Sequence, residues 1–348
     1  MRNERLPVIV ACDVHTSYGH GIEALWRGLL DGRTAFSSCE RFGNDNWRNS
    51  IAGLIPGIEN EGTARIPENL LRLVAPTAHL LPADAELFLT ASVGEIEYLE
   101  NKENRCTSDS LLEKALRICG KRSGQIVSAA CASSNMAIGI AASMIRAGRL
   151  DAATVIGLDY VSEFVHSGFF TLHAVSAGIP RPYDRDRDGL VLGDAAVAVN
   201  LCSLACARKR GWRPLAAATG WGSTCDATHV TAPVETGDWL AEAARLALRT
   251  ADAQPQDVGA VIGHGTATIY NDAMEINALK QVFPYESPPL LSVKGGCGHT
   301  LSAAGMVQAA TAIRMLETGL VPPQTSLRNP TSGAETMVSN GVRSFSKP

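Results

Sequence analysis

The chain has 348 residues, of which 45% are hydrophobic and 19% are charged, and its formal net charge is −4. This length allows two domains or one large domain, and the hydrophobic content excludes an intrinsically disordered chain. The slightly acidic balance and the lack of a basic stripe interleaved with aromatic residues argue against a nucleic-acid-binding protein.

The nine cysteines are scattered and contain no CxxC pair of the kind that binds zinc or forms a redox centre. Reduced thiols and a cytoplasmic location are therefore expected. The opening segment MRNERLPVIVACDVH has only a short apolar run before Asp13, so no signal peptide is expected.

Short apolar, β-branched runs predict buried strands along the chain. They are PVIVAC (7–12), TVIGL (154–158), AVAVNL (196–201), DVGAVIGHG (257–265) and PLLSVKG (289–295). Longer segments with helical periodicity lie between them, so an α/β fold with mostly buried sheets is predicted. The segment 44–107 mixes Pro, Asn and Glu and is predicted to form loops plus a short helix.

The stretch from Ser123 to Ile145 carries no charge and is long enough to span a bilayer, which needs about 20 residues. Its composition argues against membrane insertion, because seven of its residues are Ser, Gln or Asn, two are Gly and six are Ala. A strand that turns into a tightly packed interior helix is predicted instead.

An internal repeat is indicated when residues 128–149 are aligned with residues 296–317. The helical stretch AASMIR then falls on AATAIR, and Cys131 falls on His299. Two copies of one strand-turn-helix unit are predicted, with the thiol and the imidazole at the starts of corresponding helices. Two similar halves that meet face to face would bring these two groups together.

Cys131 is a candidate nucleophile. It lies in SAACASS (128–134), between an apolar run and an Ala-rich helix. Unsatisfied N–H groups and the helix dipole at such a position stabilise a thiolate. The alternative is an inert buried cysteine, since free cysteines are among the most buried residues.

Two histidines lie in glycine-rich segments. His264, in VIGHGTAT, follows a predicted strand, where α/β proteins place their sites, and it is a candidate donor to a substrate carbonyl. His299, in SVKGGCGHTLSAAG with Lys294, is predicted to begin a helix, whose dipole lowers the pKa of the imidazole and keeps it neutral. No metal site is predicted: DRDRDGLVLGDA (184–195) begins like a calcium loop but has Ala195 where a bidentate Glu is needed.

Together these clusters resemble the β-ketoacyl-acyl carrier protein synthases of the decarboxylating Cys-His-His type, the ketosynthases of fatty acid and polyketide biosynthesis. The resemblance rests on VIVACDVHTSYGHGIEALWRGLLDG (8–32), SAACASSNMAIG (128–139), RPYDRDRDGLVLGDAA (181–196), HGTATIYNDAME (264–275) and KGGCGHTLSAAG (294–305). It implies the thiolase fold, in which two similar α/β halves form five αβαβα layers. We place the halves at residues 1–205 and 206–348.

The resemblance also implies roles for individual residues. Cys131 is expected to be the acyl-accepting nucleophile, His264 and His299 to assist decarboxylation of a malonyl thioester, and Lys294 to support the two histidines.

The same resemblance implies the substrate contacts and the partners. Thr266 and Thr268 are expected to bind a phosphopantetheine arm, and Phe169 to line the acyl pocket. No cofactor is expected, because the substrates are carried on the phosphopantetheine of an acyl carrier protein. The family forms dimers, so a homodimer or a heterodimer with a second ketosynthase-like chain is expected.

Several positions depart from the family pattern. The segment Gly-Phe-Gly-Gly-Thr-Asn has no counterpart before the chain ends in GVRSFSKP, so the terminal strand is lost, the chain is truncated or the second backbone donor comes from elsewhere. The family's Glu nine residues after the second histidine is Gln308, GDAA (193–196) replaces GEGA, and the region 44–107 is shorter than usual.

Two readings follow from these similarities and departures. The first is an active condensing enzyme of fatty acid or polyketide biosynthesis, including the aryl-polyene type. The second is a chain-length-factor-like, weakly catalytic or non-catalytic partner of a ketosynthase. Retention of Cys131, His264 and His299 favours the first, because such factors usually replace the cysteine. A thiolase that uses CoA is disfavoured, because thiolases need a second cysteine in a different motif.

Overall fold

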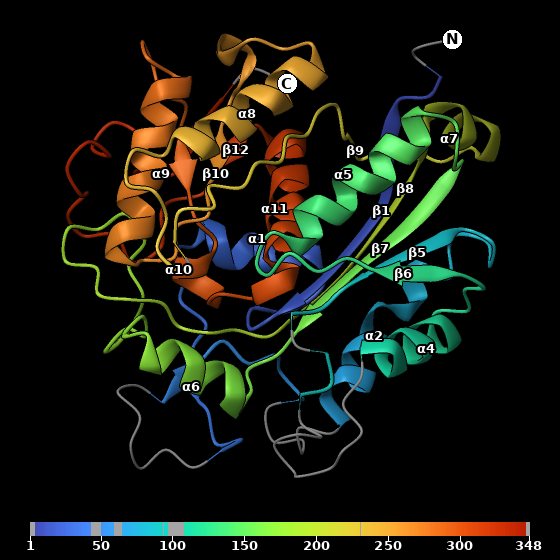
Figure 1. Cartoon of the computed structure of the whole chain (residues 1–348), viewed down its shortest axis with the longest axis horizontal. Helices are drawn as coiled ribbons and strands as arrows, with labels where there is room; N and C mark the ends of the chain where they lie inside the picture. The colour runs from blue at the N-terminus through green and yellow to red at the C-terminus, as the bar shows by residue number, and fades with distance from the viewer. Residues whose placement is uncertain are drawn as a thin grey trace.

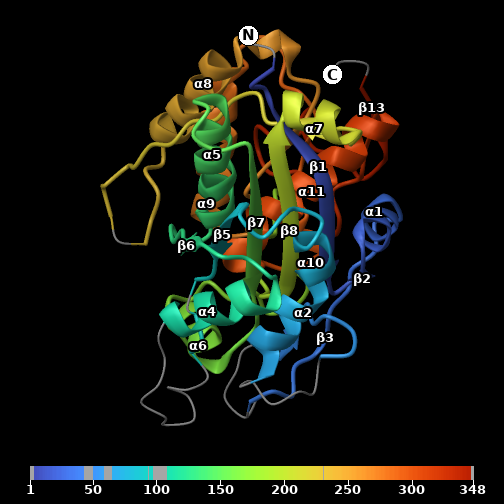
Figure 2. The same ribbon diagram turned by 90° about the vertical axis from the view of Figure 1, so that its right-hand side faces the viewer.

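The computed structural model describes residues 4–42, 50–58, 65–92, 94–96, 108–229 and 231–345. Within these residues, seven strands form the principal sheet, in the order β2-β1-β8-β7-β5-β6, with β9 also paired to β1. They are β1 (Pro7–Thr16), β2 (Gly19–His20), β5 (Glu86–Thr90), β6 (Gly124–Ile126), β7 (Ala152–Asp159), β8 (Ala195–Ser203) and β9 (Ala216–Ala217). β5, β6 and β7 are parallel, whereas β8 is antiparallel to both β1 and β7, and these long strands lie side by side in Figure 2.

Helices and a second, smaller sheet complete a layered structure (Figure 1). The elements are α2 (Ile66–Ala78), α4 (Ser108–Ile118), α5 (Ser133–Arg146), α11 (Ala304–Thr318), β10 (Val261–Ile262), β11 (Leu290–Leu291), α8 (Asp238–Ala251) and α9 (Ile269–Val282). α2 and α4 cover one face of the principal sheet, and α5 and α11 cover the other. The parallel pair β10-β11 follows, and α8 and α9 form the outermost layer. This order confirms the predicted five-layer α/β fold.

The alternation of side chains along the strands explains how the principal sheet is buried on both faces. Ala196 and Ala198 of β8 pack in the cluster with α2 and α4, whereas Val197 and Val199 pack in the cluster with α5 and α11. Successive side chains of a strand point to opposite faces, so a continuous run of apolar residues indicates a strand covered on both sides. The small alanines leave room for α2 to lie close to the sheet.

Shorter elements connect these layers. They are α1 (Ile22–Leu30), β3 (Ser37–Ser38), β4 (Ile51–Ala52), α6 (Glu163–Thr171), α7 (Leu204–Arg210), η2 (Pro255–Asp257), α10 (Lys294–Cys297), η3 (Leu301–Ala303), β12 (Leu320–Val321) and β13 (Arg343–Ser344). Among the helices of the described ranges, none is long and apolar enough to cross a membrane.

Two sequence-based predictions of secondary structure need correction. Within 44–107, the described residues form α2, of 13 residues, and the interior strand β5, rather than loops and a short helix. The predicted strands 257–265 and 289–295 contain only the short pair β10 and β11, because the following residues turn away to form the site described below. The predicted strand-to-helix transition within 123–145 is confirmed by β6 and α5. The division into halves at residue 205 stays a prediction.

A buried ion pair joins several segments beside the principal sheet. Arg41 donates from Nη1 to Asp194 Oδ1 (2.8 Å) and from Nη2 to Oδ2 (2.7 Å), and both side chains are almost inaccessible to solvent. The same carboxylate accepts hydrogen bonds from the backbone N–H groups of Ile55 and Val161. Asp194 therefore ties together parts of the chain that are distant in sequence.

Removing this carboxylate should destabilise the fold. We expect Asp194→Ala to lower the free energy of unfolding by about 3–5 kcal/mol, because the buried Arg41 guanidinium loses its counter-ion. Asp151→Ala, which removes an exposed ion pair with Arg5, should cost less than about 1 kcal/mol. Chemical denaturation of both variants tests this, and equal effects would contradict it.

Candidate active site

Cys131 lies in a tight turn at the start of α5. Ala130 adopts a left-handed backbone conformation (φ 48°), and the helix begins two residues after the cysteine. The Ser133 hydroxyl holds the turn, since it accepts from Ala129 N–H (2.8 Å) and donates to Ala130 O (2.6 Å). The predicted position of Cys131 before a helix is confirmed, and its thiol is half-buried.

Side chains from several elements hold the backbone around His264. Glu275 of α9 accepts from the N–H groups of His264 (2.5 Å) and Gly265 (2.8 Å). Ser292 Oγ donates to Gly265 O (2.7 Å), and Lys294 Nζ donates to His264 O.

Gly263 completes this arrangement. Its N–H donates to Leu291 O (2.8 Å), and its carbonyl accepts from Gln308 Nε2 (2.7 Å). All six backbone N–H and C=O groups of residues 263–265 are therefore satisfied, as buried polar groups require. A side chain at Gly263 would lie 2.1 Å from the Tyr183 hydroxyl, so the site has room only for glycine there.

His299 is held by the segment that leads into β8. Its N–H donates to Val191 O (2.7 Å), and its carbonyl accepts from Gly193 N–H (3.1 Å). Gly298 precedes it with φ 82°, and a Cβ there would lie 2.7 Å from Leu192 O. Both the left-handed conformation and the close approach therefore require glycine at this position.

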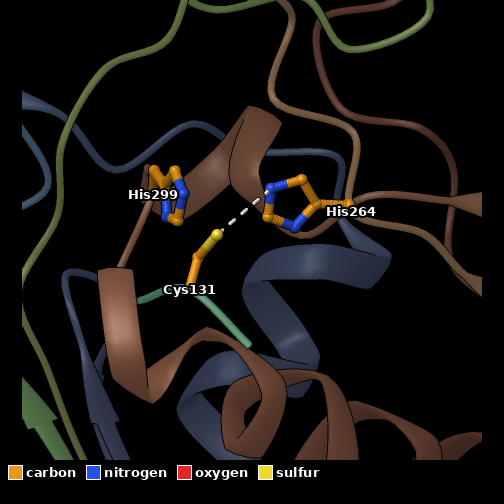
Figure 3. A group of neighbouring side chains, drawn as sticks. All are labelled: Cys131, His264 and His299. Atoms are coloured by element: carbon orange, nitrogen blue, oxygen red, sulfur yellow. Dashed lines mark hydrogen bonds between the residues drawn. The ribbon is translucent and has the colours of Figure 1, made fainter. Parts of the chain in front are cut away.

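The thiol and the two imidazoles converge on one point (Figure 3). Cys131 Sγ lies 3.8 Å from His264 Nε2, and the two histidine rings are 5.4 Å apart between centroids and nearly perpendicular. Lys294, which is buried, lies behind His264 with its Nζ 3.3 Å from Nδ1. The structure thus brings together the four residues that the sequence selected from three separate motifs.

Hydrogen bonds to Nδ1 place the proton of each histidine on Nε2. His299 Nδ1 accepts from the N–H of Leu301 (3.1 Å). An ammonium has only donors, so Lys294 donates to Nδ1 of His264. Each neutral ring therefore carries its hydrogen on Nε2, which makes the pair two hydrogen-bond donors.

Burial and the charge of Lys294 keep both imidazoles neutral. Burial, followed by the nearby Lys294 ammonium, holds the pKa of His264 well below its ordinary value. The same two causes, with a smaller contribution from His264, lower the pKa of His299. The predicted neutral state of His299 is supported, but burial takes the place of the helix dipole as its main cause. Burial also lowers the pKa of Lys294.

The same three side chains resemble a metal site, since one ligand-type atom from each of Cys131, His264 and His299 lies within 4.8 Å of the others. Coordination through Nε2 needs a bare nitrogen there and a proton on Nδ1. Leu301 N–H and Lys294 occupy Nδ1 of the two rings and oppose that tautomer. The arrangement therefore suits donation to a substrate oxygen better than metal coordination.

The calcium-like segment 184–195 uses its carboxylates for internal contacts. Asp184 accepts from the backbone N–H groups of Asp186, Arg328 and Asn329. Asp188 accepts from the Ser176 hydroxyl and from the N–H of Ala177. These carboxylates organise the chain around the site.

A cavity of about 660 Å³ opens above the thiol. Its lining includes Cys131, His264, His299, Thr266, Thr268 and Phe169, which are six of the seven residues selected from the sequence. The hydroxyls of Thr266 and Thr268 lie 2.8 Å apart, and the Phe169 ring of α6 lies 6.3 Å from His299. This arrangement accommodates a long, narrow substrate whose reactive end lies at the thiol and the two imidazoles.

Sequence reasoning missed two parts of the site. Glu275 was inside a recognised motif but received no role, although it lies three residues after Asp272 and therefore on the same face of α9. Asp226, His229 and Thr231 line the cavity from a segment without helix or strand, so no periodicity marked them.

Comparison with known proteins agrees with this geometry. The family descriptions "Beta-ketoacyl synthase, N-terminal domain" and "Beta-ketoacyl synthase, C-terminal domain" match residues 124–207 and 215–328. The chain is 28% identical to 3-oxoacyl-[acyl-carrier-protein] synthase 2 of Vibrio cholerae, over 95% of this chain and 91% of that protein.

Two further relatives are also ketosynthases by name. A putative polyketide beta-ketoacyl synthase 1 of Streptomyces virginiae is 27% identical, over 94% of this chain and 89% of that protein. The solved ishigamide ketosynthase/chain length factor superposes with a TM-score of 0.89 at 26% identity, over 98% of this chain and 94% of the other.

The fold and the Cys-His-His site thus define a condensing acyltransferase of the thiolase-like class. Within this class, the chain belongs to the β-ketoacyl synthase family, whose members form carbon–carbon bonds.

The low histidine pKa values predict how stability changes with pH. An unfolded histidine binds a proton below about pH 6.5, whereas buried His299 stays neutral, so its contribution to the free energy of unfolding falls as the pH falls. We expect the stability of the parent relative to His299→Gln to decrease by about 1 kcal/mol between about pH 7 and about pH 5.5.

Chemical denaturation of the two proteins at both pH values measures this difference. Asp159 and Asp272, whose pKa values burial raises to about 6, act in the opposite direction but are present in both proteins and cancel. A constant or increasing difference would contradict the neutral state of His299.

Proposed function

We propose that this chain catalyses the decarboxylative condensation of an acyl thioester with a malonyl thioester, both carried on the phosphopantetheine arm of an acyl carrier protein. The proposal is supported above all by the convergence of the Cys131 thiol with two neutral Nε2–H donors. Such a site combines a nucleophile with donors for a developing oxyanion, which are the two requirements of this reaction.

In the first half-reaction, the Cys131 thiolate attacks the carbonyl carbon of the acyl thioester. A carbon–sulfur bond to Cys131 forms, the bond to the carrier's sulfur breaks, and the carrier leaves as a thiol with the proton that Cys131 gave up. Cys131 lies just before the first turn of α5, in the turn that the Ser133 hydroxyl holds. The covalent intermediate divides one difficult condensation into two easier steps.

In the second half-reaction, the malonyl thioester occupies the same cavity. The bond to its carboxylate breaks, carbon dioxide leaves, and the electron pair forms an enolate whose oxygen accepts hydrogen bonds from the Nε2–H groups of His264 and His299. The enolate carbon then attacks the acyl carbonyl on Cys131 and expels the thiolate. The two Nε2–H donors are in place before the negative charge develops on the enolate oxygen, so they stabilise this charge without having to move.

Thr266, Thr268 and Phe169 are proposed to bind the substrate rather than to react. The two threonine hydroxyls lie on the cavity wall next to His264, where they can donate to the amides of a pantetheine arm. Arg187 and Asp272 fix this segment, by donation to Thr268 O (3.3 Å) and acceptance from Thr266 N–H (3.0 Å).

Cys131 should become acylated. Incubation with an acyl thioester, on carrier protein or as an N-acetylcysteamine ester, should add one acyl mass to the peptide that contains Cys131. We expect Cys131→Ala to abolish this gain and Cys225→Ala, which removes an exposed thiol, to leave it unchanged. Intact-protein and peptide mass spectrometry measure both, and an adduct on another cysteine alone would reject the assignment.

The two histidines should act mainly on the malonyl half-reaction. We expect His264→Ala and His299→Ala each to slow release of carbon dioxide from a malonyl thioester by about 100- to 1000-fold, the usual effect of losing one oxyanion donor. Acylation of Cys131 should largely survive. His79→Ala is the control and should decarboxylate at the parent rate, because His79 is an exposed histidine that contacts Ile118 O next to α2, on the other face of the principal sheet. Decarboxylation at the parent rate in His264→Ala or His299→Ala would show that the assignment is wrong.

One observation supports a second function, that of a chain-length-factor-like partner: the similarity to the ishigamide ketosynthase/chain length factor. The catalytic function is supported more strongly, because Cys131, His264, His299 and Lys294 are all present and lie together. Either function is compatible with a dimer formed through β6, the strand at one edge of the principal sheet in the described residues.

Co-expression with a second ketosynthase-like chain from the same pathway separates the two functions. A catalytic subunit should form a dimer whose condensing activity is lost with Cys131→Ala in this chain. If the complex keeps its full activity with that variant, the partner supplies the chemistry and the chain-length-factor function is correct. Light scattering of the separate chains shows whether a homodimer also forms, and a monomer would contradict both forms of assembly.

A further inference from the structure

Gln308 lies nine residues after His299 and carries a neutral amide side chain. It lies in the second turn of α11 and is partly buried. Its side-chain Nε2 donates to the carbonyl of Gly263 (2.7 Å), the residue just before His264. The Gln308 side chain therefore lies next to the reaction site.

This hydrogen bond joins the supports of the two histidines. α11 begins at Ala304, beyond the short turn of η3, so Gln308 belongs to the helix that follows the second imidazole in the chain. Gly263 belongs to the segment that carries the first. The other side chains that hold residues 263–265 come from α9, from α10 and from the segment before α10. Gln308 thus connects the His264 backbone directly to the element that follows His299.

The chemistry of the contact requires a donor. A carbonyl oxygen only accepts, so an ionised glutamate at this position would place two acceptors against each other. A protonated glutamate, in contrast, carries an O–H that can replace the amide. Movement of Gly263 toward other partners is restricted, because its N–H is already bonded to Leu291 O and Tyr183 packs against its α-carbon.

We propose that Gln308 is a positioning residue for the malonyl half-reaction: its amide fixes the separation of the two imidazole donors through the Gly263 carbonyl. This inference rests on the proposed function. Two donors must reach the same enolate oxygen, so the distance between them matters, whereas acylation of Cys131 does not need both. Loss of the amide should therefore affect decarboxylation more than acylation.

Three variants test the proposal in the whole protein. Gln308→Met keeps the length of the side chain without a donor and should reduce decarboxylation of malonyl-CoA by about 10- to 100-fold, the effect of a small misplacement of reacting groups. Acylation of Cys131 should change less than about threefold. Gln281→Met is the matched control, because it removes an amide that donates to Thr236 O (2.8 Å) far from the site, and both rates should stay at the parent level.

Gln308→Glu supplies a signature that a merely structural role would not produce. A glutamate that faces a carbonyl has a raised pKa and donates only when protonated. Its decarboxylation rate relative to the parent should therefore rise as the pH is lowered from about 8 to about 5.5. The same ratio for Gln308→Met should stay low and constant.

Each outcome has a separate meaning. If the parent decarboxylates malonyl-CoA but Gln308→Met matches it, the positioning role is overturned while the proposed function stands. Equal losses of decarboxylation and acylation, or a pH-independent ratio for Gln308→Glu, also overturn it. If the parent itself releases no carbon dioxide, alone or with its partner chain, the proposed function fails and the inference fails with it.

Discussion

The buried Lys294 is the group on which the chemistry of this site depends. Its ammonium donates to the carbonyl and to Nδ1 of His264, so it fixes both the position and the tautomer of that ring. Burial lowers the pKa of both histidines, and the charge of Lys294 lowers it further, so that both rings stay neutral. A cation in such a place is costly to bury unless hydrogen-bond partners surround it. His264 provides two such partners, its backbone carbonyl and its ring Nδ1.

The fold determines that two helix starts face one cavity. α5 and α11 lie in the same middle layer, against the same face of the principal sheet, and their N-terminal ends carry Cys131 and the turn of His299. His264 comes from a third element, at the end of β10. A separate set of hydrogen bonds must therefore hold it in position relative to Cys131 and His299. Glu275, Lys294, Ser292 and Gln308 supply this set.

This division of tasks explains which substitutions should separate the two half-reactions. Acyl transfer needs the thiol and the start of α5, which are close in sequence and held by local bonds such as those of Ser133. Decarboxylation needs two imidazoles from different parts of the chain, so it depends on contacts between layers. Residues that touch no substrate, such as Gln308, can therefore affect one half-reaction and leave the other intact.

The sequence by itself determined the α/β class and the identities of Cys131, His264, Lys294 and His299, because glycine-rich turns and a small-residue helix mark local backbone requirements that few sequences meet. It also placed the long strands β1, β7 and β8 from their apolar runs, and β7 and β8 are buried on both faces. Only the tertiary structure decided that β5 is an interior strand, that Glu275 and Gln308 hold the His264 segment, and that residues near His229 wall the cavity. These features depend on contacts between residues far apart in the chain. A local pattern of side chains does not identify which distant segment will contact it.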